Sequence, residues 1–323
     1  MTSIPDQVRQ AAAAVMAEAD FVRIHATKIP SYTKALLAKY PVVTTLDPAN
    51  HFIIPDNPEQ TAAYVLALDS INFGSGYFKV AQEAEIPLEY TVIAGALKEA
   101  FLDERLDNAD KWSRVSAADC HDVFNVPVGR RTRLDELMRL FALHLNETGR
   151  RIESEYGGKV LNLLEACGNS AVALVEQVAT WPTFADVAVY KGRAVPVFKR
   201  AQILAADMYL ALQGAAPAGF TDMNALTIFS DNMVAHVLHS DGLVEYAPAL
   251  QDKIFRGVPL DAGSPEETEI RAAAIHAVEL MKNADTREGI RVNSVNLDHI
   301  LWNRGYEAGI YEKPAHRTFS VWY

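Results

Sequence analysis

Cysteine is almost absent from this sequence of 323 residues, which contains only Cys120 and Cys167. The two cysteines are far apart and form no C-x-x-C pair, so the sequence predicts a reducing compartment and no disulfide framework. Residues 1–20 lack a basic leader followed by an apolar run, so we expect no signal peptide. No apolar run approaches the length of a membrane span. We therefore expect a soluble, cytoplasmic protein without membrane contact.

Basic residues are also scarce. The chain has 30 Lys and Arg against 41 Asp and Glu, which gives a net charge of −11. A protein that binds a nucleic-acid duplex needs a basic surface to displace counterions. The charge balance therefore argues against long DNA or RNA and favours a small-molecule partner. Since 50% of the residues are hydrophobic, a chain of this length can form one large core or two closely packed domains.

Internal repeats, low-complexity runs and evident flexible linkers are missing, and most of the expected elements are helices. Apolar periodicity and start signals predict helices over about 4–24, 58–71, 88–103, 131–155, 159–166, 171–181, 201–212, 232–239, 264–281 and 297–302. Around Gly74-Ser75-Gly76 the third glycine and the βαβ context of a phosphate loop are absent, so we expect a turn and the start of a short strand. Alternation over residues 184–192 predicts one or two further strands. The sequence thus predicts a mainly α fold with minor β.

Residues 190–242 carry the most chemical information. In the helical run AQILAADMYLAL, Ile203, Asp207 and Leu210 share one face, which places a carboxylate in an apolar stripe. Asp207 is therefore either a core aspartate with a protein partner or a group that binds a ligand, since a buried charge needs a partner. Asp231 stands at the start of the next helix, where the macrodipole favours a negative charge. Asp231 can serve as an N-cap, as a functional carboxylate, or as both.

Two resemblances follow from these segments. VFKRAQILAADMY and TIFSDNMVAHVL resemble the helix-hairpin-helix DNA glycosylases, in which a lysine-bearing hairpin precedes a catalytic aspartate that opens the next helix. More specifically, YKGRAVPVFKRAQILAADMYLAL, LTIFSDNMVAHVLHSDGLV and the ending HRTFSVWY are similar to the queuosine-salvage N-glycosylase family. The second resemblance extends from about His51 to Tyr323. The aromatic ending is also expected to dock on the core rather than to fray.

The family resemblance implies a fold and an activity. The implied fold is a helix-hairpin-helix DNA-glycosylase-like helical core over about 160–310, within a single compact unit of residues 1–323 that could consist of two interleaved helical lobes. The implied activity is hydrolysis of queuosine 5′-monophosphate to queuine and ribose 5-phosphate without a cofactor. The base is a 7-deazapurine without an N7 to protonate, so the enzyme must stabilise the oxocarbenium-like state strongly. Asp231 is the expected catalytic residue, acting electrostatically or by covalent capture.

Several further residues are expected to bind the substrate. Asp207 would accept the two adjacent N–H donors on the guanine-like edge of queuine. Tyr209 and Phe229 could stack on the base or pack in the core, and Asn169 could contact the substrate or cap the helix that follows. Lys199 corresponds to the Schiff-base lysine of bifunctional DNA glycosylases, but with Arg200 beside it phosphate binding or structural pairing is the simpler interpretation. The predicted substrate-binding set is His51, Asn72, Phe73, Asn169, Lys199, Asp207, Tyr209, Phe229 and Asn232, with Asp69 completing the family pattern before Asn72 and Phe73.

We predict no metal. His236 and His239 with Asp241 could form a metal-binding face on one helix, but no second cluster of ligands supports it. Two alternative functions remain open at this point. A DNA repair glycosylase or lyase is favoured by Lys199 and opposed by the net charge, and a non-catalytic helical module for a nucleotide or a partner protein would make both aspartates structural.

Overall fold

The computed structural model describes residues 2–285 and 292–323 and confirms the mainly α fold with minor β. The first half of the chain forms α1 (Ile4–Ala17), β1 (Val22–Ile24), the 3₁₀ turn η1 (Ala26–Lys28), α2 (Ile29–Lys39), α3 (Pro58–Ser70), α4 (Ser75–Glu83), α5 (Tyr90–Leu102), α6 (Ala109–Trp112), α7 (Ala117–Val123) and α8 (Thr132–Tyr156). The second half forms α9 (Val160–Ala166), α10 (Ala171–Val178), β2 (Val187–Tyr190), β3 (Arg193–Pro196), α11 (Lys199–Ala211), η2 (Met223–Ala225), α12 (Asn232–Ser240), β4 (Val244–Tyr246), α13 (Pro248–Phe255), α14 (Pro265–Ala284) and α15 (Ser294–Arg304).

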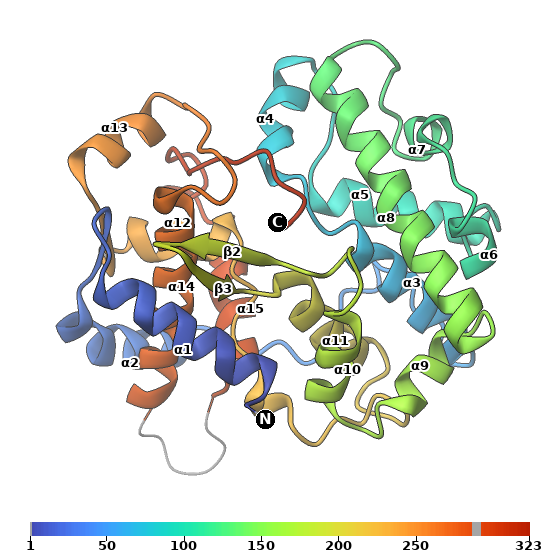
Figure 1. Cartoon of the computed structure of the whole chain (residues 1–323), viewed down its shortest axis with the longest axis horizontal. Helices are drawn as coiled ribbons and strands as arrows, with labels where there is room; N and C mark the ends of the chain where they lie inside the picture. The colour runs from blue at the N-terminus through green and yellow to red at the C-terminus, as the bar shows by residue number, and fades with distance from the viewer. Residues whose placement is uncertain (1, 286–291) are drawn as a thin grey trace.

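The helices gather on two sides of a central group of elements (Figure 1). On one side α1 packs along α14, and α12 contacts both α14 and α15. On the other side the long helix α8 contacts α3, α4, α6 and α7. Between the two sides α11 packs against α3 and α10, with β2 and β3 above it in the view of Figure 1. Lys199 and Asp207 on α11 therefore lie between the two sides, and Asp231 lies at the start of α12 on the side of α14.

The segment before α11 is a β-hairpin rather than a helix. β2 pairs antiparallel with β3, from Val187 opposite Pro196 to Tyr190 opposite Arg193, which confirms that residues 184–192 contain a strand. Phe198 then adopts a left-handed backbone (φ 50°) and turns the chain into α11. α11 is buried on nearly every side, so its packing requires the side chains of Lys199 and Asp207 to find partners within the protein or the site.

The predicted helix over residues 4–24 is wrong at its end. α1 stops at Ala17, and Val22–Ile24 form a strand that pairs antiparallel with Val244–Tyr246. The carboxylate of Glu269 accepts hydrogen bonds from the backbone N–H groups of Asp20, Phe21 and Val22. Local periodicity could not reveal this strand, because both its partner strand and the anchoring carboxylate lie more than half the chain away.

The predicted short strand after Gly74-Ser75-Gly76 is also wrong, because helix α4 begins there. Gly74 has a φ of 116°, which L side chains rarely adopt, and it turns the chain into α4 without a side-chain cap. A Cβ atom at Gly76 would overlap the carbonyl oxygen of Thr318. Gly74 and Gly76 thus allow α4 and the C-terminal segment to approach each other closely. This contact cannot be predicted from the local sequence, because the two segments are far apart in the chain.

The C-terminal segment docks on the core, as the aromatic ending predicts. Thr318 forms an isolated parallel bridge with Leu260, and the Tyr323 carbonyl accepts a hydrogen bond from the Gly74 N–H. His316, Thr318 and Tyr323 are buried. In Figure 1 the end of the chain lies between the two sides of the molecule, close to α4. The C-terminal segment therefore lies between the two sides of the molecule.

Candidate active site

A cavity of about 970 Å³ opens between the two sides of the molecule. Its walls come from the end of α3, from α4, from the starts of α5 and α12, from the ends of α13 and α15, and from the C-terminal segment. Five of the residues predicted from the sequence line it, namely Asn72, Phe73, Lys199, Asp231 and Asn232. The cavity is at the upper end of the range for small-molecule sites, which is about 300–1,000 Å³.

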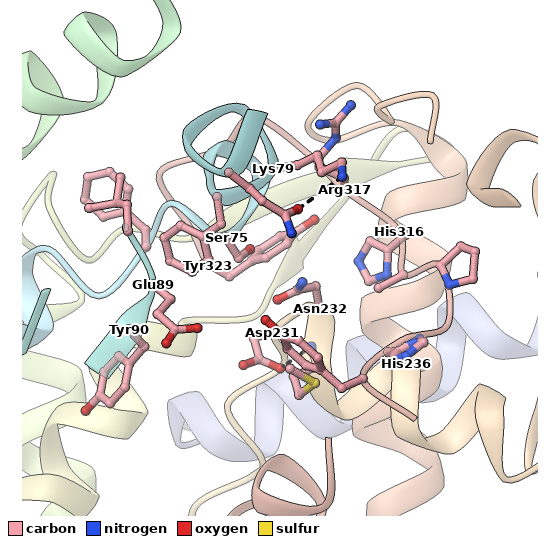
Figure 2. A pocket seen from close by; sticks show the side chains of 18 of the residues that line it. Ser75, Lys79, Glu89, Tyr90, Asp231, Asn232, His236, His316, Arg317 and Tyr323 are labelled. Atoms are coloured by element: carbon pink, nitrogen blue, oxygen red, sulfur yellow. Dashed lines mark hydrogen bonds between the residues drawn. The ribbon is translucent and has the colours of Figure 1, made fainter. Parts of the chain in front are cut away.

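Asp231 is the N-cap of α12 and reaches the cavity wall. Its Oδ1 atom accepts hydrogen bonds from the N–H groups of Met233 (2.9 Å) and Val234 (3.0 Å). Within the described residues Oδ2 accepts no hydrogen bond, and the side chain faces the open space in Figure 2. Burial raises the pKa of Asp231, while the Lys199 ammonium and the two capping amides lower it. One oxygen is thus held in place and the other is available to a ligand.

Lys199 connects α11 to the end of α3. Its Nζ donates to the backbone oxygen of Asn72 at 3.0 Å and to Oδ1 of the same residue at 3.1 Å. The Asn72 amide in turn donates to Oδ1 of Asp69 at 3.0 Å, and Oδ2 of Asp69 is buried without a hydrogen-bond partner. Burial lowers the pKa of Lys199, and the negative charges of Asp231 and Asp69 counteract this effect. The ammonium is therefore engaged within the protein beside the cavity.

Asp69, Asp207 and Asp298 form an acidic cluster around Lys199. Burial raises the pKa of Asp69 to about 7, and it raises the pKa of Asp207 well above the usual value, with the charge of Asp69 adding to the effect. Burial also raises the pKa of Asp298, whose Oδ2 accepts the Phe229 N–H at 2.9 Å. Within the described part of the chain, only one lysine lies among these carboxylates, and burial shifts the pKa of each of them upward, toward the protonated form.

A buried ion pair fixes the segments that hold Lys199 and Asp231. Arg271 binds Asp186 through Nη1–Oδ1 at 2.9 Å and Nη2–Oδ2 at 2.6 Å. The same carboxylate accepts the Lys199 N–H, and Nε of Arg271 donates to the carbonyl of Ser230, the residue before Asp231. The N-terminus of α11 and the start of α12 are therefore positioned by one pair of side chains.

The other predicted site residues do not line the cavity. Asp207 is 3% exposed and lies behind the wall, within the electrostatic influence of Asp69 and Tyr90. His51 is also behind the wall and binds the hydroxyl of Tyr90, a lining residue, through Nε2 at 3.0 Å. Phe229 is buried near the His299 ring. These three residues can influence a ligand only through a neighbour or after a rearrangement of the wall.

Asn169, Tyr209 and Arg200 lie elsewhere. Ser170, not Asn169, caps α10, and Asn169 is exposed. Tyr209 is half-buried, with its ring against Gly214. The Arg200 guanidinium points into the core, where it donates to the carbonyls of Ser70 and Thr183 and lies 4.9 Å from the centre of the Phe73 ring. Arg200 is thus committed to the core beneath the cavity.

Sequence reasoning missed several lining residues. An aromatic wall is formed by Tyr90, Trp302 and Tyr306, with ring centres 5.5 Å apart for Tyr90–Trp302 and 4.9 Å apart for Trp302–Tyr306. Glu89, His236, His316, Lys79 and Arg317 also face the cavity (Figure 2). The sequence signal for His316 and Arg317 was the unusual aromatic ending, which indicated docking but no chemistry, and His236 had been singled out only for a possible metal face.

The possible metal face on α12 is not assembled. His236 binds the carbonyl of Ile310 through Nε2, whereas His239 binds the carbonyl of Val244 through Nδ1 and stacks on Tyr246. Among the described residues no three His, Cys, Asp or Glu side chains converge in a way that could hold a metal ion. Within residues 2–285 and 292–323, no helix has the length and apolarity needed to cross a bilayer.

A deep cavity with fixed polar groups and an aromatic wall defines a protein that binds a small molecule. Comparison with known proteins specifies the class further. The chain belongs to the queuosine salvage protein family, whose model matches residues 52–323. It is 34% identical over 315 residues to the queuosine 5′-phosphate N-glycosylase/hydrolase of Sphaerobacter thermophilus, and the aligned region covers 96% of this chain and 95% of that protein. Proteins of the same name from Dictyostelium discoideum and Mus musculus are 31% identical over 268 residues (82% and 79% covered) and 28% identical over 298 residues (84% and 85% covered).

Proposed function

We propose that the protein hydrolyses the N-glycosidic bond of queuosine 5′-monophosphate and releases queuine and ribose 5-phosphate. The family and the names of the relatives support this activity. The observation that carries the proposal is Asp231, which is fixed by two amides through one oxygen while its second oxygen is free at the cavity wall. Such a carboxylate is suited to stabilise an oxocarbenium-like transition state at C1′ or to capture it.

The acidic cluster around Lys199 is suited to the base. A guanine-like edge presents two N–H donors next to a carbonyl acceptor, and a pair of carboxyl groups that shares one proton offers both acceptors and a donor. Asp69 and Asp207 are the pair that we assign to this role. Both are buried behind the cavity wall, so the wall must rearrange for the base edge to reach them. The aromatic wall of Tyr90, Trp302 and Tyr306 supplies flat surfaces for the base.

The two alternative functions are not favoured. A bifunctional DNA lyase needs a lysine free to attack a sugar aldehyde, but Lys199 is 4% exposed and donates twice to Asn72. A net charge of −11 also provides little driving force for binding a duplex. A purely structural module would not need a free carboxylate oxygen at the cavity wall.

The direct test is incubation of the purified protein with queuosine 5′-monophosphate, followed by chromatography and mass spectrometry. We expect queuine and ribose 5-phosphate to appear in equal amounts and guanosine 5′-monophosphate to remain intact. Absence of queuine release under conditions in which the protein is folded would overturn the proposal.

A further inference from the structure

The cations that the sequence suggested for phosphate binding are not available for it. Nζ of Lys199 donates to Asn72, and the Arg200 guanidinium is turned into the core. Yet a nucleotide substrate brings a dianionic phosphate, which needs cations or N–H donors near the cavity. Cations elsewhere on the wall that are not engaged in this way are therefore better placed to bind the phosphate.

Three cations on the cavity wall have no carboxylate partner. Within the described residues Lys79, Lys313 and Arg317 form no ion pair, although the chain contains 41 acidic residues against 30 basic ones. The Lys79 ammonium donates only to the side chain of Gln82, and Arg317 donates only to the carbonyl of Gly257. In Figure 2, Lys79 and Arg317 lie on the same side of the cavity, across from Asp231. Unpaired cations that face one cavity in an acidic protein indicate an anionic ligand.

His316 gives an independent indication of a ligand on this wall. It is 2% exposed and lines the cavity, and neither of its ring nitrogens has a hydrogen-bond partner in the protein. A buried polar group without a partner costs stability unless a ligand or water satisfies it. Burial lowers the pKa of His316 to about 3, with His236 and Arg271 adding to the effect, so the free ring is neutral and offers one donor and one acceptor.

The start of α4 lies beside these side chains. Ser75 and Lys79, one turn apart, both line the cavity, and α4 has no side-chain cap at its N-terminus. The N–H groups of Ser75 and Gly76 have no hydrogen-bond partner among the described residues, whereas the Gly74 N–H is used by Tyr323. Free amides at the positive end of a helix favour an anion. The start of α4 at Ser75, the cations and the unpartnered imidazole thus belong to one part of the cavity wall.

We infer that His316, Lys79 and Arg317, together with the uncapped start of α4 at Ser75, bind the 5′-phosphate of the nucleotide substrate. The inference rests on the proposed hydrolysis of queuosine 5′-monophosphate and assigns the part of the site that separates nucleotide from nucleoside. A phosphate held on this wall fixes the ribose from one end, while the base is held by the acidic cluster. Binding energy from the phosphate thereby orients C1′ toward Asp231.

The first test compares the nucleotide with the nucleoside. We expect Lys79→Gln, Arg317→Gln and His316→Asn each to lower the ratio of kcat/KM for queuosine 5′-monophosphate to kcat/KM for queuosine by about 10- to 100-fold, the range for one charge-assisted hydrogen bond. The matched control is Lys34→Gln on α2, an exposed lysine outside the cavity, which should keep the wild-type ratio. Variants that are folded and keep the wild-type ratio would overturn the inference.

A second test does not depend on turnover. In the wild-type protein, inorganic phosphate should shift the imidazole NMR signals of His316 in a saturable way, and the signals are assigned by their loss in His316→Asn. The double variant Lys79→Gln/Arg317→Gln should show no saturable shift. An equal shift in the double variant, or none in the wild type, would refute the phosphate site. Failure of the wild type to release queuine, with the phosphate response intact, would instead refute only the proposed substrate.

Discussion

Arg271 and Asp186 form a fully buried, two-point ion pair, with each side chain 2% exposed. Removing the arginine would leave the Asp186 carboxylate buried without its counter-charge. We expect Arg271→Met to lower the free energy of unfolding by about 3–5 kcal/mol, the cost of breaking a buried pair from one side. Denaturant titration measures this change. The control Arg193→Met breaks an exposed pair with Glu18 and should cost at most about 1 kcal/mol, and equal losses for both variants would contradict the expectation.

Asp231→Asn separates the two roles of this residue. Asparagine is as good an N-cap as aspartate, so α12 should stay folded and queuine should still bind. The negative charge that stabilises the transition state is lost, so kcat should fall below about a tenth of the wild-type value, a loss of at least ~1.4 kcal/mol. Steady-state kinetics and a thermal melt on the same sample check both halves. A variant that exceeds this residual kcat would remove Asp231 from the chemistry.

Asp207→Asn should change affinity and stability in opposite directions. The amide cannot accept two N–H donors, so queuine binding should weaken by on the order of 2–4 kcal/mol. In the free protein, however, the variant removes a carboxyl group whose pKa burial raises well above normal, so at about pH 8 it should melt at a higher temperature than the wild type. Calorimetry with queuine and a thermal melt measure the two quantities. A lower melting temperature with unchanged affinity would show that Asp207 is only structural.

Asp69 makes stability depend on pH in a defined direction. Burial raises the pKa of this carboxyl from 3.8 to about 7, so between these values the folded state keeps a proton that the unfolded state has lost. The contribution of Asp69 to the free energy of unfolding therefore falls as pH rises through this window and is constant above it. We expect the difference in unfolding free energy between Asp69→Asn and the wild type to shift in favour of the variant from about pH 5 to about pH 7. A pH-independent difference would contradict this assignment.

Gly76→Ala tests the contact between α4 and the C-terminal segment. The added methyl group would overlap the carbonyl oxygen of Thr318, so the segment with His316 and Arg317 must move. We expect a loss of about 1–3 kcal/mol in stability, as for overpacking, together with a lower kcat/KM for the nucleotide. Gly95→Ala in α5 is the matched control, because its methyl group would meet no atom within 4 Å and should stabilise the helix by up to about 1 kcal/mol. Similar effects of both substitutions would refute the proposed contact.

Much of the helical framework could be predicted from the sequence, because the signals are local. The helices predicted over 58–71, 131–155, 201–212 and 232–239 correspond to α3, α8, α11 and α12, and their start signals, end signals and apolar periodicity all lie within one continuous segment each. Asp231 stands at the N-cap position that its residue type favours. The strand Val22–Ile24 and the start of α4 at Ser75 could not be predicted in the same way, because each depends on a segment distant in the chain.

The same distinction applies to the site. Asn72, Phe73, Lys199, Asp231 and Asn232 were predicted from their motifs, and all five line one cavity. Their roles stay predictions. His316, Lys79 and Arg317 were not singled out, because no spacing connects a helix at residue 79 with an extended segment near residue 316. Within the described residues His316 has no hydrogen-bond partner for its ring, and Lys79 and Arg317 have no carboxylate partner; these properties exist only in the folded structure.

The contact between Phe21 and Glu269 has a consequence for synthesis of the protein. The two residues are 248 positions apart, and the same carboxylate also binds the N–H groups on either side of Phe21. At about 5–20 residues per second, the ribosome needs on the order of ten to fifty seconds to make the partner of this segment. During that interval α1 and β1 have neither α14 nor β4 to cover them. The apolar face of the nascent N-terminal segment therefore stays uncovered until the last third of the chain emerges.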